Sequence, residues 1–213
     1  MAELSFTTSC TRCDRLAGFL ADVRASHPDY FARPVPSFGP QRPRLLIVGL
    51  APGMHGANAT GRPFTGDYAG VLLYETLHEL GFASRPESVS ATDGLELLDC
   101  RITNAVRCLP PQNKPVGAEV KACNDYLAEE IAQLRPGSVV LALGLVAHNA
   151  VLTALQLRKV AHKFGHGSDY PLPGELRLLS SYHCSRYNTN TNRLTPEMFA
   201  AVFRVAREHI DNL

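Results

Sequence analysis

Four of the six cysteines have a spacing that suggests a metal centre. Cys10 and Cys13 form a C-x-x-C pair near the N-terminus, and Cys108 and Cys123 form a C-x14-C pair. Zinc sites usually combine two C-x-x-C pairs or include histidine, whereas four thiolates with one wide spacing suit an iron–sulfur cluster at least as well. The spacing predicts a metal on these four cysteines, with iron–sulfur slightly favoured and zinc still open.

A glycine-rich segment, residues 49–67, reads GLAPGMHGANATGRPFTGD. Its glycines lack the G-x-G-x-x-G spacing, and the chain has no P-loop Lys-Ser/Thr pair, so no nucleotide cofactor is expected. Glycines instead allow backbone amides to approach a flat ligand closely, and Phe64 supplies an aromatic face for it. Asp67 is a candidate catalytic carboxylate, or else the N-cap of the next helix. His55 either lines the same pocket or forms a hydrogen bond within the loop.

Two further polar segments carry candidate site residues. Residues 103–115 read TNAVRCLPPQNKP, and residues 181–190 read SYHCSRYNTN. His183 could polarise a substrate or donate a proton, although a lone loop histidine often makes only structural hydrogen bonds. Asn113 is a candidate contact for water or a base, and its alternative is a turn residue. Asn104 is a weaker candidate, because it could simply cap the end of a strand.

These segments must be positioned by regular elements, which the apolar pattern locates. Apolar runs predict strands at residues 44–50, 101–106, 138–143 and 177–181, and helical spacing predicts helices at residues 10–25, 68–80, 118–134 and 146–157, with a last helix starting at Thr195 and Pro196. Five prolines in residues 28–43 predict an irregular arm, and residues 159–174 are expected to form a loop.

Alternating strands and helices predict a three-layer α/β/α sandwich with a roughly four-stranded, mostly parallel sheet. Residues 1–213 would form one domain, with an N-terminal helix and Pro-rich arm in residues 1–43 and the α/β core in residues 44–213. Ligands of such sheets bind beyond the carboxyl ends of the strands. The three polar segments fall there, so we expect one composite site.

The composition excludes several classes of protein. The 213 residues are 45% hydrophobic and 19% charged, which excludes disorder and coiled coil. With 21 Lys+Arg and 20 Asp+Glu the formal net charge is +1, so any contact with nucleic acid must come from a local basic patch. No secretory signal is recognised, and the apolar stretch at residues 139–147 is too short to span a membrane. A cytoplasmic protein without a membrane partner is expected.

Taken together, the three motifs and the four cysteines closely resemble the family 5 (B-type) uracil-DNA glycosylases, iron–sulfur members of the uracil-DNA glycosylase superfamily. The resemblance extends from Cys10 to the last helix. It implies a parallel sheet between helices and a [4Fe-4S] cluster on the four cysteines, which ties down the N-terminal helix. It also implies monofunctional excision of uracil from DNA, and of deaminated bases such as hypoxanthine, as the start of base excision repair.

The resemblance further implies a role for each candidate residue. The target nucleotide must leave the base stack before its N-glycosidic bond can be hydrolysed. Phe64 would stack on the extruded base, Asp67 and Asn113 would contact water, and His183 would face the departing base. The expected base pocket comprises Gly49, Ala51, Pro52, Gly53, His55, Phe64 and Asn104, and the expected DNA contacts are Arg62, Lys114, Ser185, Arg186, Tyr187 and Asn188. Relatives often carry Gln in place of Tyr187 and Arg in place of Ala59.

Two other functions compete with this interpretation. A catalytically silent iron–sulfur module could recognise damaged DNA, but it would have no need of Asp67, His183 and Phe64, which are all present. A small-nucleotide hydrolase would need a phosphate loop or a cluster of metal-binding carboxylates, and the sequence shows neither. We therefore expect a glycosylase that acts as a monomer on DNA.

Overall fold

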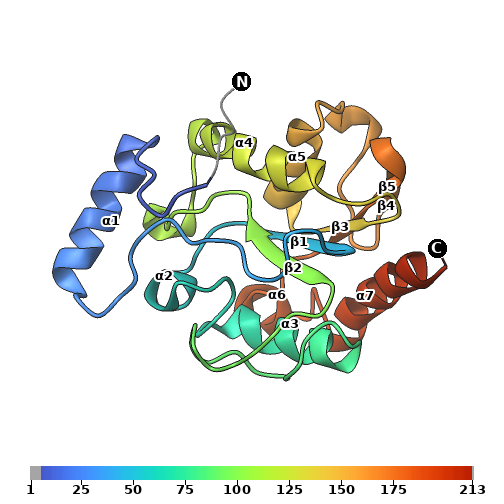
Figure 1. Ribbon diagram of the computed structural model, residues 1–213, viewed down its shortest axis with the longest axis horizontal. Coiled ribbons are helices and arrows are strands. Elements are labelled where there is room, and N and C mark those ends of the chain that lie inside the picture. The colour runs from blue at the N-terminus through green and yellow to red at the C-terminus, as the bar shows by residue number, and fades with distance from the viewer. Residues whose placement is uncertain (1–5, 213) are drawn as a thin grey trace.

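A five-stranded sheet with helices on both faces forms the centre of the computed structural model, which describes residues 6–212 (Figure 1). The strands are β1 (Leu45–Gly49), β2 (Cys100–Asn104), β3 (Val139–Leu143), β4 (Asp169–Leu172) and β5 (Leu176–Ser181). The helices are α1 (Asp14–Ser26), α2 (Ala57–Thr60), α3 (Tyr68–Glu79), α4 (Gly117–Ala132), α5 (Leu145–Ala154), α6 (Arg186–Asn190) and α7 (Pro196–Asp211). Short 3₁₀ helices occupy Pro111–Asn113, Lys159–Ala161 and Pro173–Glu175.

The strand order is β2-β1-β3-β5-β4, and only the pairing of β4 with β5 is antiparallel. All residues of β1 and β3 are buried, because helices cover both faces of these central strands. Leu45 and Ile47 point into a core shared with α3 and α7. Leu46 and Val48 point into a second core shared with α4 and α5. This alternation explains why both strands are apolar without interruption, and it confirms the predicted three layers.

The sheet, expected to have roughly four strands, contains a fifth strand that the sequence did not reveal. β4 lies inside residues 159–174, which were expected to form a loop, and it pairs with β5 at the edge of the sheet. Its sequence, DYPL, has only Leu172 buried and includes Pro171, which lacks the N–H that a central strand would need. An edge strand needs apolar residues on one face at most, so β4 leaves no continuous apolar run in the sequence.

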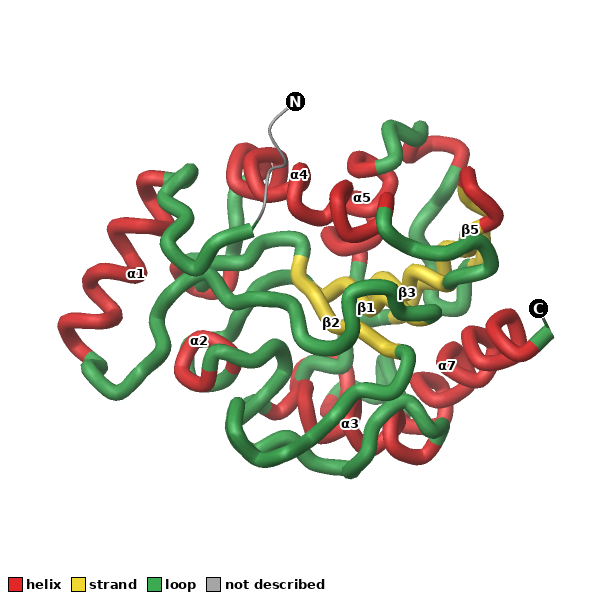
Figure 2. The backbone as a smooth tube through the Cα atoms, viewed as in Figure 1, coloured by secondary structure: helices red, strands yellow, loops and turns green. Residues whose placement is uncertain are grey.

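The first helix begins later than its apolar spacing predicted. α1 starts at Asp14, so Cys10 and Cys13 precede the helix, and Cys13 occupies its N-cap position. Leu20 and Val23 of α1 pack against Ala32 of the Pro-rich arm and against Leu109. The arm between α1 and β1 and the connection between α3 and β2 are long and irregular (Figure 2).

Within residues 6–212, the helices are all too short or too polar to traverse a lipid bilayer.

Candidate functional site

The carboxyl ends of the parallel strands bring the three polar segments to one edge of the sheet. Gly49 ends β1 and is paired in register with Asn104, which ends β2. His183 follows β5 by two residues, and Gly144 follows β3 directly. A Cβ atom on Gly144 would lie 3.6 Å from the Cβ atom of His183, so the turn after β3 adjoins His183. The structure thus brings Gly49, Asn104, Gly144 and His183 to one edge of the sheet, where the sequence predicted a composite site.

Gly49, Phe64 and Asn104 lie in direct contact at this edge. A Cβ atom on Gly49 would lie 2.4 Å from Oδ1 of Asn104 and 2.8 Å from two ring carbons of Phe64, so only glycine fits. Phe64 is buried and has a positive φ of 55°. Such a backbone conformation is costly for a bulky residue and is typical of functional sites.

Asn104 has an unused hydrogen-bonding atom in this cluster. Its side-chain Oδ1 is buried and has no hydrogen-bond partner among the described residues. Buried polar atoms are almost always paired, because an unpaired one costs about 1–3 kcal/mol. An unpaired acceptor beside an aromatic ring therefore points to a ligand that donates a hydrogen bond. Asn104 was expected to be a weaker candidate site residue than Asn113, because an asparagine at the end of a strand can simply cap that strand.

His183 completes the aromatic part of the site. Its ring stacks on that of Phe64, with ring centroids 5.8 Å apart and an interplanar angle of 25°. Asn188 Nδ2 donates a hydrogen bond of 2.8 Å to the backbone carbonyl of His183, which fixes the turn. Burial lowers the pKa of His183 to about 4, so the imidazole is neutral at pH 7 and can donate one ring N–H.

Asp67 serves as the N-cap of α3, so the structural role considered from the sequence is confirmed. Its Oδ1 accepts a 3.0 Å hydrogen bond from the backbone N–H of Gly70. Its Oδ2 faces the glycine-rich loop: Cβ atoms on Gly53 and Gly56 would lie 3.6 Å and 2.6 Å from it. Burial raises the pKa of Asp67, while hydrogen bonds from Gly70 and Ala69 act in the opposite direction. One carboxylate oxygen thus caps the helix and the other faces the loop.

The loop between Gly49 and Asp67 is more ordered than its composition suggested. The backbone N–H of Asn58 donates to the carbonyl of Gly53 at 3.1 Å, and the short helix α2 follows. Pro52 is buried and Ala51 is half-buried. His55 points elsewhere: it is exposed, and its Nδ1 forms a 2.7 Å hydrogen bond with Tyr30 Oη. The expected hydrogen bond within the loop was wrong, since the partner of His55 belongs to the Pro-rich arm, and its place in the base pocket stays a prediction.

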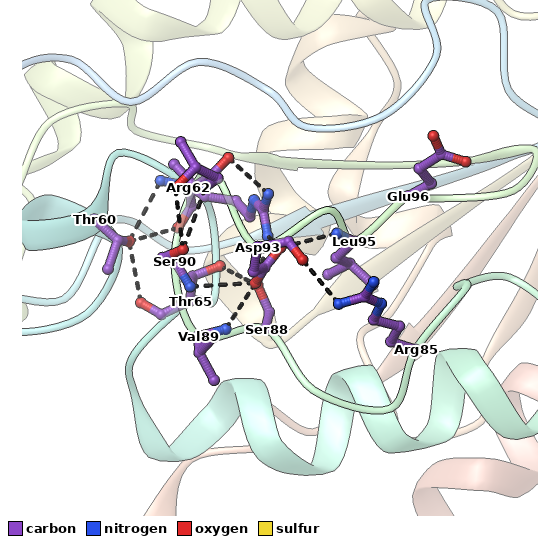
Figure 3. A network of polar contacts seen from close by, with 12 residues as sticks. Thr60, Arg62, Thr65, Arg85, Ser88, Val89, Ser90, Asp93, Leu95 and Glu96 are labelled. Atoms are coloured by element: carbon purple, nitrogen blue, oxygen red, sulfur yellow. Dashed lines mark hydrogen bonds and ion pairs between the residues drawn. The ribbon is translucent and has the colours of Figure 1, made fainter.

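Arg62 was predicted to contact DNA, and the structure corrects this assignment. Its guanidinium forms an ion pair of 2.7 Å with Asp93, and both side chains are less than 10% exposed (Figure 3). Further hydrogen bonds reach Ser88 Oγ at 3.0 Å and the carbonyl of Ala91 at 2.9 Å. The guanidinium also lies 4.3 Å from the ring centroid of Phe38. Arg62 therefore holds the long α3–β2 connection in place instead of facing DNA.

The segment after His183 combines structural and exposed residues. Ser185 is the N-cap of α6 and accepts from the backbone N–H of Asn188. Arg186 is exposed and lies 4.9 Å from the ring centroid of Tyr68, whereas Tyr187 is 71% exposed and free to reach a ligand. The short helix α6 was not predicted from the sequence, although Ser185, its N-cap residue, is of a type that favours the start of a helix.

Asn113 and Lys114 lie in an exposed turn beyond β2. Asn113 belongs to the 3₁₀ helix Pro111–Asn113 and has a positive φ of 56°, as expected for its alternative role in a turn. The carbonyl of Lys114 accepts a 3.3 Å hydrogen bond from Arg15 of α1. No hydrogen bond joins the side chain of Asn113 to another residue within 6–212, and its contact with water or a base stays a prediction.

The four candidate metal ligands gather around one small, mainly apolar hollow between α1, the segment after β2, and α4. Cys10, Cys13, Cys108 and Cys123 are all free thiols. Tyr126 Oη donates to Cys10 Sγ and the backbone N–H of Arg107 donates to Cys123 Sγ, each at 3.4 Å. Burial and then the neighbouring thiols raise the pKa of Cys108 to about 12.

Four thiols are a donor set that both iron–sulfur clusters and zinc use. Within residues 6–212, no three His, Cys, Asp or Glu side chains converge closely enough to hold one metal ion. Four thiols around a hollow match a larger group in which each iron binds one thiolate. The positive charge of bound iron would also favour the thiolates that burial disfavours. The residues therefore fit an iron–sulfur cluster.

Comparisons with known proteins identify the family of this chain. Residues 36–207 match the family described as the Uracil DNA glycosylase superfamily. The type-5 uracil-DNA glycosylase of Thermus thermophilus is 49% identical over 205 residues, covering 94% of this chain and 93% of that protein. Proteins of the same name from Pyrobaculum aerophilum and Mycobacterium bovis are 44% and 42% identical, over 93% of this chain and over 88% and 77% of theirs.

The fold has a counterpart among solved structures. The crystal structure of Pedobacter heparinus SMUG2 matches with a TM-score of 0.51 at 15% identity, covering 99% of this chain and 94% of that chain. At this identity the match concerns the fold alone. The family expected from the three motifs is confirmed by the more similar relatives, and the chain belongs to the uracil-DNA glycosylase superfamily.

Proposed function

We propose that this chain is a uracil-DNA glycosylase that hydrolyses the N-glycosidic bond of uracil in DNA. The observation that carries the proposal is the unpaired Oδ1 of Asn104 next to the ring of Phe64. Uracil has an N3–H donor beside a carbonyl acceptor, which matches the acceptor and donor of an asparagine amide. Cytosine has an acceptor and an amino group at these positions, so the same amide would oppose it.

The remaining site groups suit the charges of this reaction. As the bond between N1 and C1′ breaks, the electron pair leaves with uracil and C1′ becomes positive. A neutral His183 can donate to a uracil oxygen that becomes more negative, which favours the transition state over the ground state. Asp67 can offset the positive sugar and accept the proton of the water that attacks C1′. The products are free uracil and an abasic site.

Deaminated purines extend the proposed substrate range. Hypoxanthine has an N1–H donor beside a C6 carbonyl, which repeats the pattern of uracil N3–H and O4. An asparagine amide that reads this pair would accept both bases if the pocket admits the larger ring. The abasic product would pass to base excision repair. None of the residues assigned to the base pocket or to catalysis is a lysine, in keeping with excision that leaves the strand intact.

We also propose that Cys10, Cys13, Cys108 and Cys123 hold a [4Fe-4S] cluster. When bound, such a cluster supplies iron that binds all four thiolates. Its place between α1 and α4 supports a structural role, since Arg15 of α1 forms an ion pair with Glu119 of α4, and Arg12, just before α1, forms one with Asp125 of α4. Purified protein should be brown and contain iron and sulfide. Cys13→Ser should bleach the cluster absorbance, and equal colour in that variant would exclude Cys13 as a ligand.

The glycosylase proposal is tested on a duplex with one uracil. Incubation followed by alkali should cleave the strand at the uracil, and a matched thymine duplex should stay intact. An uncleaved uracil strand at enzyme excess would contradict the proposal and favour the silent DNA-binding module. The same assay with hypoxanthine tests the wider range separately.

A further inference from the structure

A groove between α4 and α5 combines free positive charge with an absence of carboxylates. It is lined by Pro115, Gly117, Val120, Lys121, Asn124, Val146, Asn149, Ala150, Thr153 and Lys159. The two helices lie side by side on one face of the sheet (Figure 1). Asn124 Nδ2 joins them through a 2.9 Å hydrogen bond to the carbonyl of Ala150. The groove therefore has a fixed floor with a lysine on each side.

The distribution of lysine in the chain is uneven. The chain has only four lysines, at positions 114, 121, 159 and 163, all between the end of β2 and the start of β4. Within residues 6–212 no ion pair includes a lysine, although nine arginines form ion pairs. The charges of Lys121 and Lys159 are thus available to a ligand.

The carboxylates of α4 that could neutralise Lys121 are already occupied. Asp125, four residues along the helix from Lys121, forms a 2.6 Å ion pair with Arg12, which lies two residues before α1. Glu119 accepts from Arg15 through both of its oxygens at 2.7 Å. Arg12 and Arg15 therefore compete with Lys121 for the negative charge at this end of α4.

The second lysine is held in place by α5. Lys159 begins a 3₁₀ turn, Lys159–Ala161, and the next carbonyl, that of His162, accepts a 2.8 Å hydrogen bond from His148 Nε2. His148 is fully buried in α5. The turn is therefore held against the helix, and Lys159 lines the groove.

One end of the groove adjoins the candidate active site. Val146 lies in the first turn of α5, two residues after Gly144, whose Cβ position would contact His183. Val146 is 39% exposed and Leu145 is 53% exposed. Exposed apolar side chains beside free lysines suit the alternating sugars and phosphates of a nucleic-acid strand, because apolar groups contact the sugar and ammonium groups the phosphate.

We propose that the α4–α5 groove binds the phosphodiester backbone of substrate DNA next to the flipped nucleotide, with Lys121 and Lys159 as phosphate contacts. The inference rests on the proposed action on DNA. It gives a chain with a formal net charge of +1 the local cationic surface that binding to DNA needs. Lys121 and Lys159 would thus supply phosphate contacts that the buried Arg62 does not make.

The test uses the complete protein and a duplex with a tetrahydrofuran abasic-site analogue, which cannot be turned over. Lys121→Gln with Lys159→Gln should raise the Kd at least about tenfold at 100 mM salt and reduce the slope of log K against log salt by about 2. Arg42→Gln is the matched control, because Arg42 is exposed, has no ion pair within 6–212, and precedes β1 at the opposite edge of the sheet. This control should keep the wild-type slope.

Lysine labelling gives an independent readout in the wild type. Acetylation followed by peptide mass spectrometry should show DNA protecting Lys121 and Lys159 at least about threefold. Unchanged reactivity of both lysines, or equal Kd for the double variant and wild type, would overturn the proposal that the groove binds DNA. Uracil excision by the wild type is measured in parallel. The absence of excision would overturn the proposed function. Excision without lysine protection would overturn only the proposal that the groove binds DNA.

Discussion

The rings of Phe64 and His183 are nearly parallel, and their centroids are 5.8 Å apart. A base inserted between two rings needs about 3.5 Å on each face, so this gap is too narrow for one. A flipped base that stacks on the face of Phe64 covered by His183 would displace His183. That displacement would move the turn after β5, which Asn188 and Ser185 hold in the absence of a base.

His183→Ala tests this relationship. We expect the single-turnover rate of uracil excision to fall at least about tenfold, because a donor to the departing base is lost. Binding of a duplex with non-hydrolysable 2′-fluorinated deoxyuridine should not weaken, because the variant no longer covers Phe64. A rate within twofold of wild type would remove His183 from the mechanism, and a much weaker complex would contradict the displacement.

The low pKa of His183 makes stability depend on pH. Burial lowers the pKa from 6.5 to about 4, so between these values the unfolded chain binds more protons than the folded one. The contribution of His183 to the free energy of unfolding is therefore constant above pH 6.5 and falls as the pH drops toward 4. Between pH 7.5 and 5 the free energy of unfolding should decrease by up to about 2 kcal/mol because of this residue. Urea unfolding of wild type and His183→Leu at pH 7.5 and pH 5 measures this decrease. An identical pH dependence of the free energy of unfolding in the two proteins would contradict the prediction.

The convergence of Gly49, Asn104 and His183 could be predicted, and the environment of Arg62 could not. Gly49 and Asn104 end parallel strands and His183 follows one, and these strands can be recognised locally, so their common edge was predictable. Arg62 lies in a motif that suggested DNA contact, but its partner Asp93 lies 31 residues away in an irregular connection. Local sequence patterns carry no signal for such pairing. The antiparallel edge strand β4 was missed for a related reason, because only its pairing with β5 defines it.

Asp67→Asn separates the structural and chemical roles of one side chain. Asparagine is as good an N-cap as aspartate, so the hydrogen bond with Gly70 should persist and the free energy of unfolding should change by less than about 1 kcal/mol. The charge that offsets the sugar cation is lost, and the single-turnover rate should fall at least about a hundredfold. Thermal unfolding and excision are measured on the same preparation. A stable variant with the wild-type rate would limit Asp67 to capping.

Asn104→Leu should make the protein more stable and less active. The buried Oδ1 has no partner within 6–212, so an apolar side chain of similar size removes an unpaired acceptor and should add about 1 kcal/mol to the free energy of unfolding. Excision should fall at least about a hundredfold, because the uracil N3–H loses its acceptor. Asn104→Ala is the control for volume, since it removes the amide without filling the space. An active Leu variant would show that another group recognises the base.

Arg62→Ala should destabilise the fold without changing the salt dependence of DNA binding. Burial alone would raise the pKa of Asp93, but Arg62 and the backbone N–H groups of Leu95, Ser90 and Val89 hold it below its ordinary value. Removing Arg62 leaves this carboxylate buried and unpaired, which should cost about 3–5 kcal/mol. Adding Asp93→Asn should recover part of the loss, because the unpaired charge is then absent. Urea unfolding of the single and double variants measures this coupling. Arg186→Gln is the contrasting change: its exposed side chain should affect DNA affinity and leave stability within about 0.5 kcal/mol. If Arg62→Ala instead kept wild-type stability and lost about one unit of salt slope, Arg62 would be a phosphate contact after all.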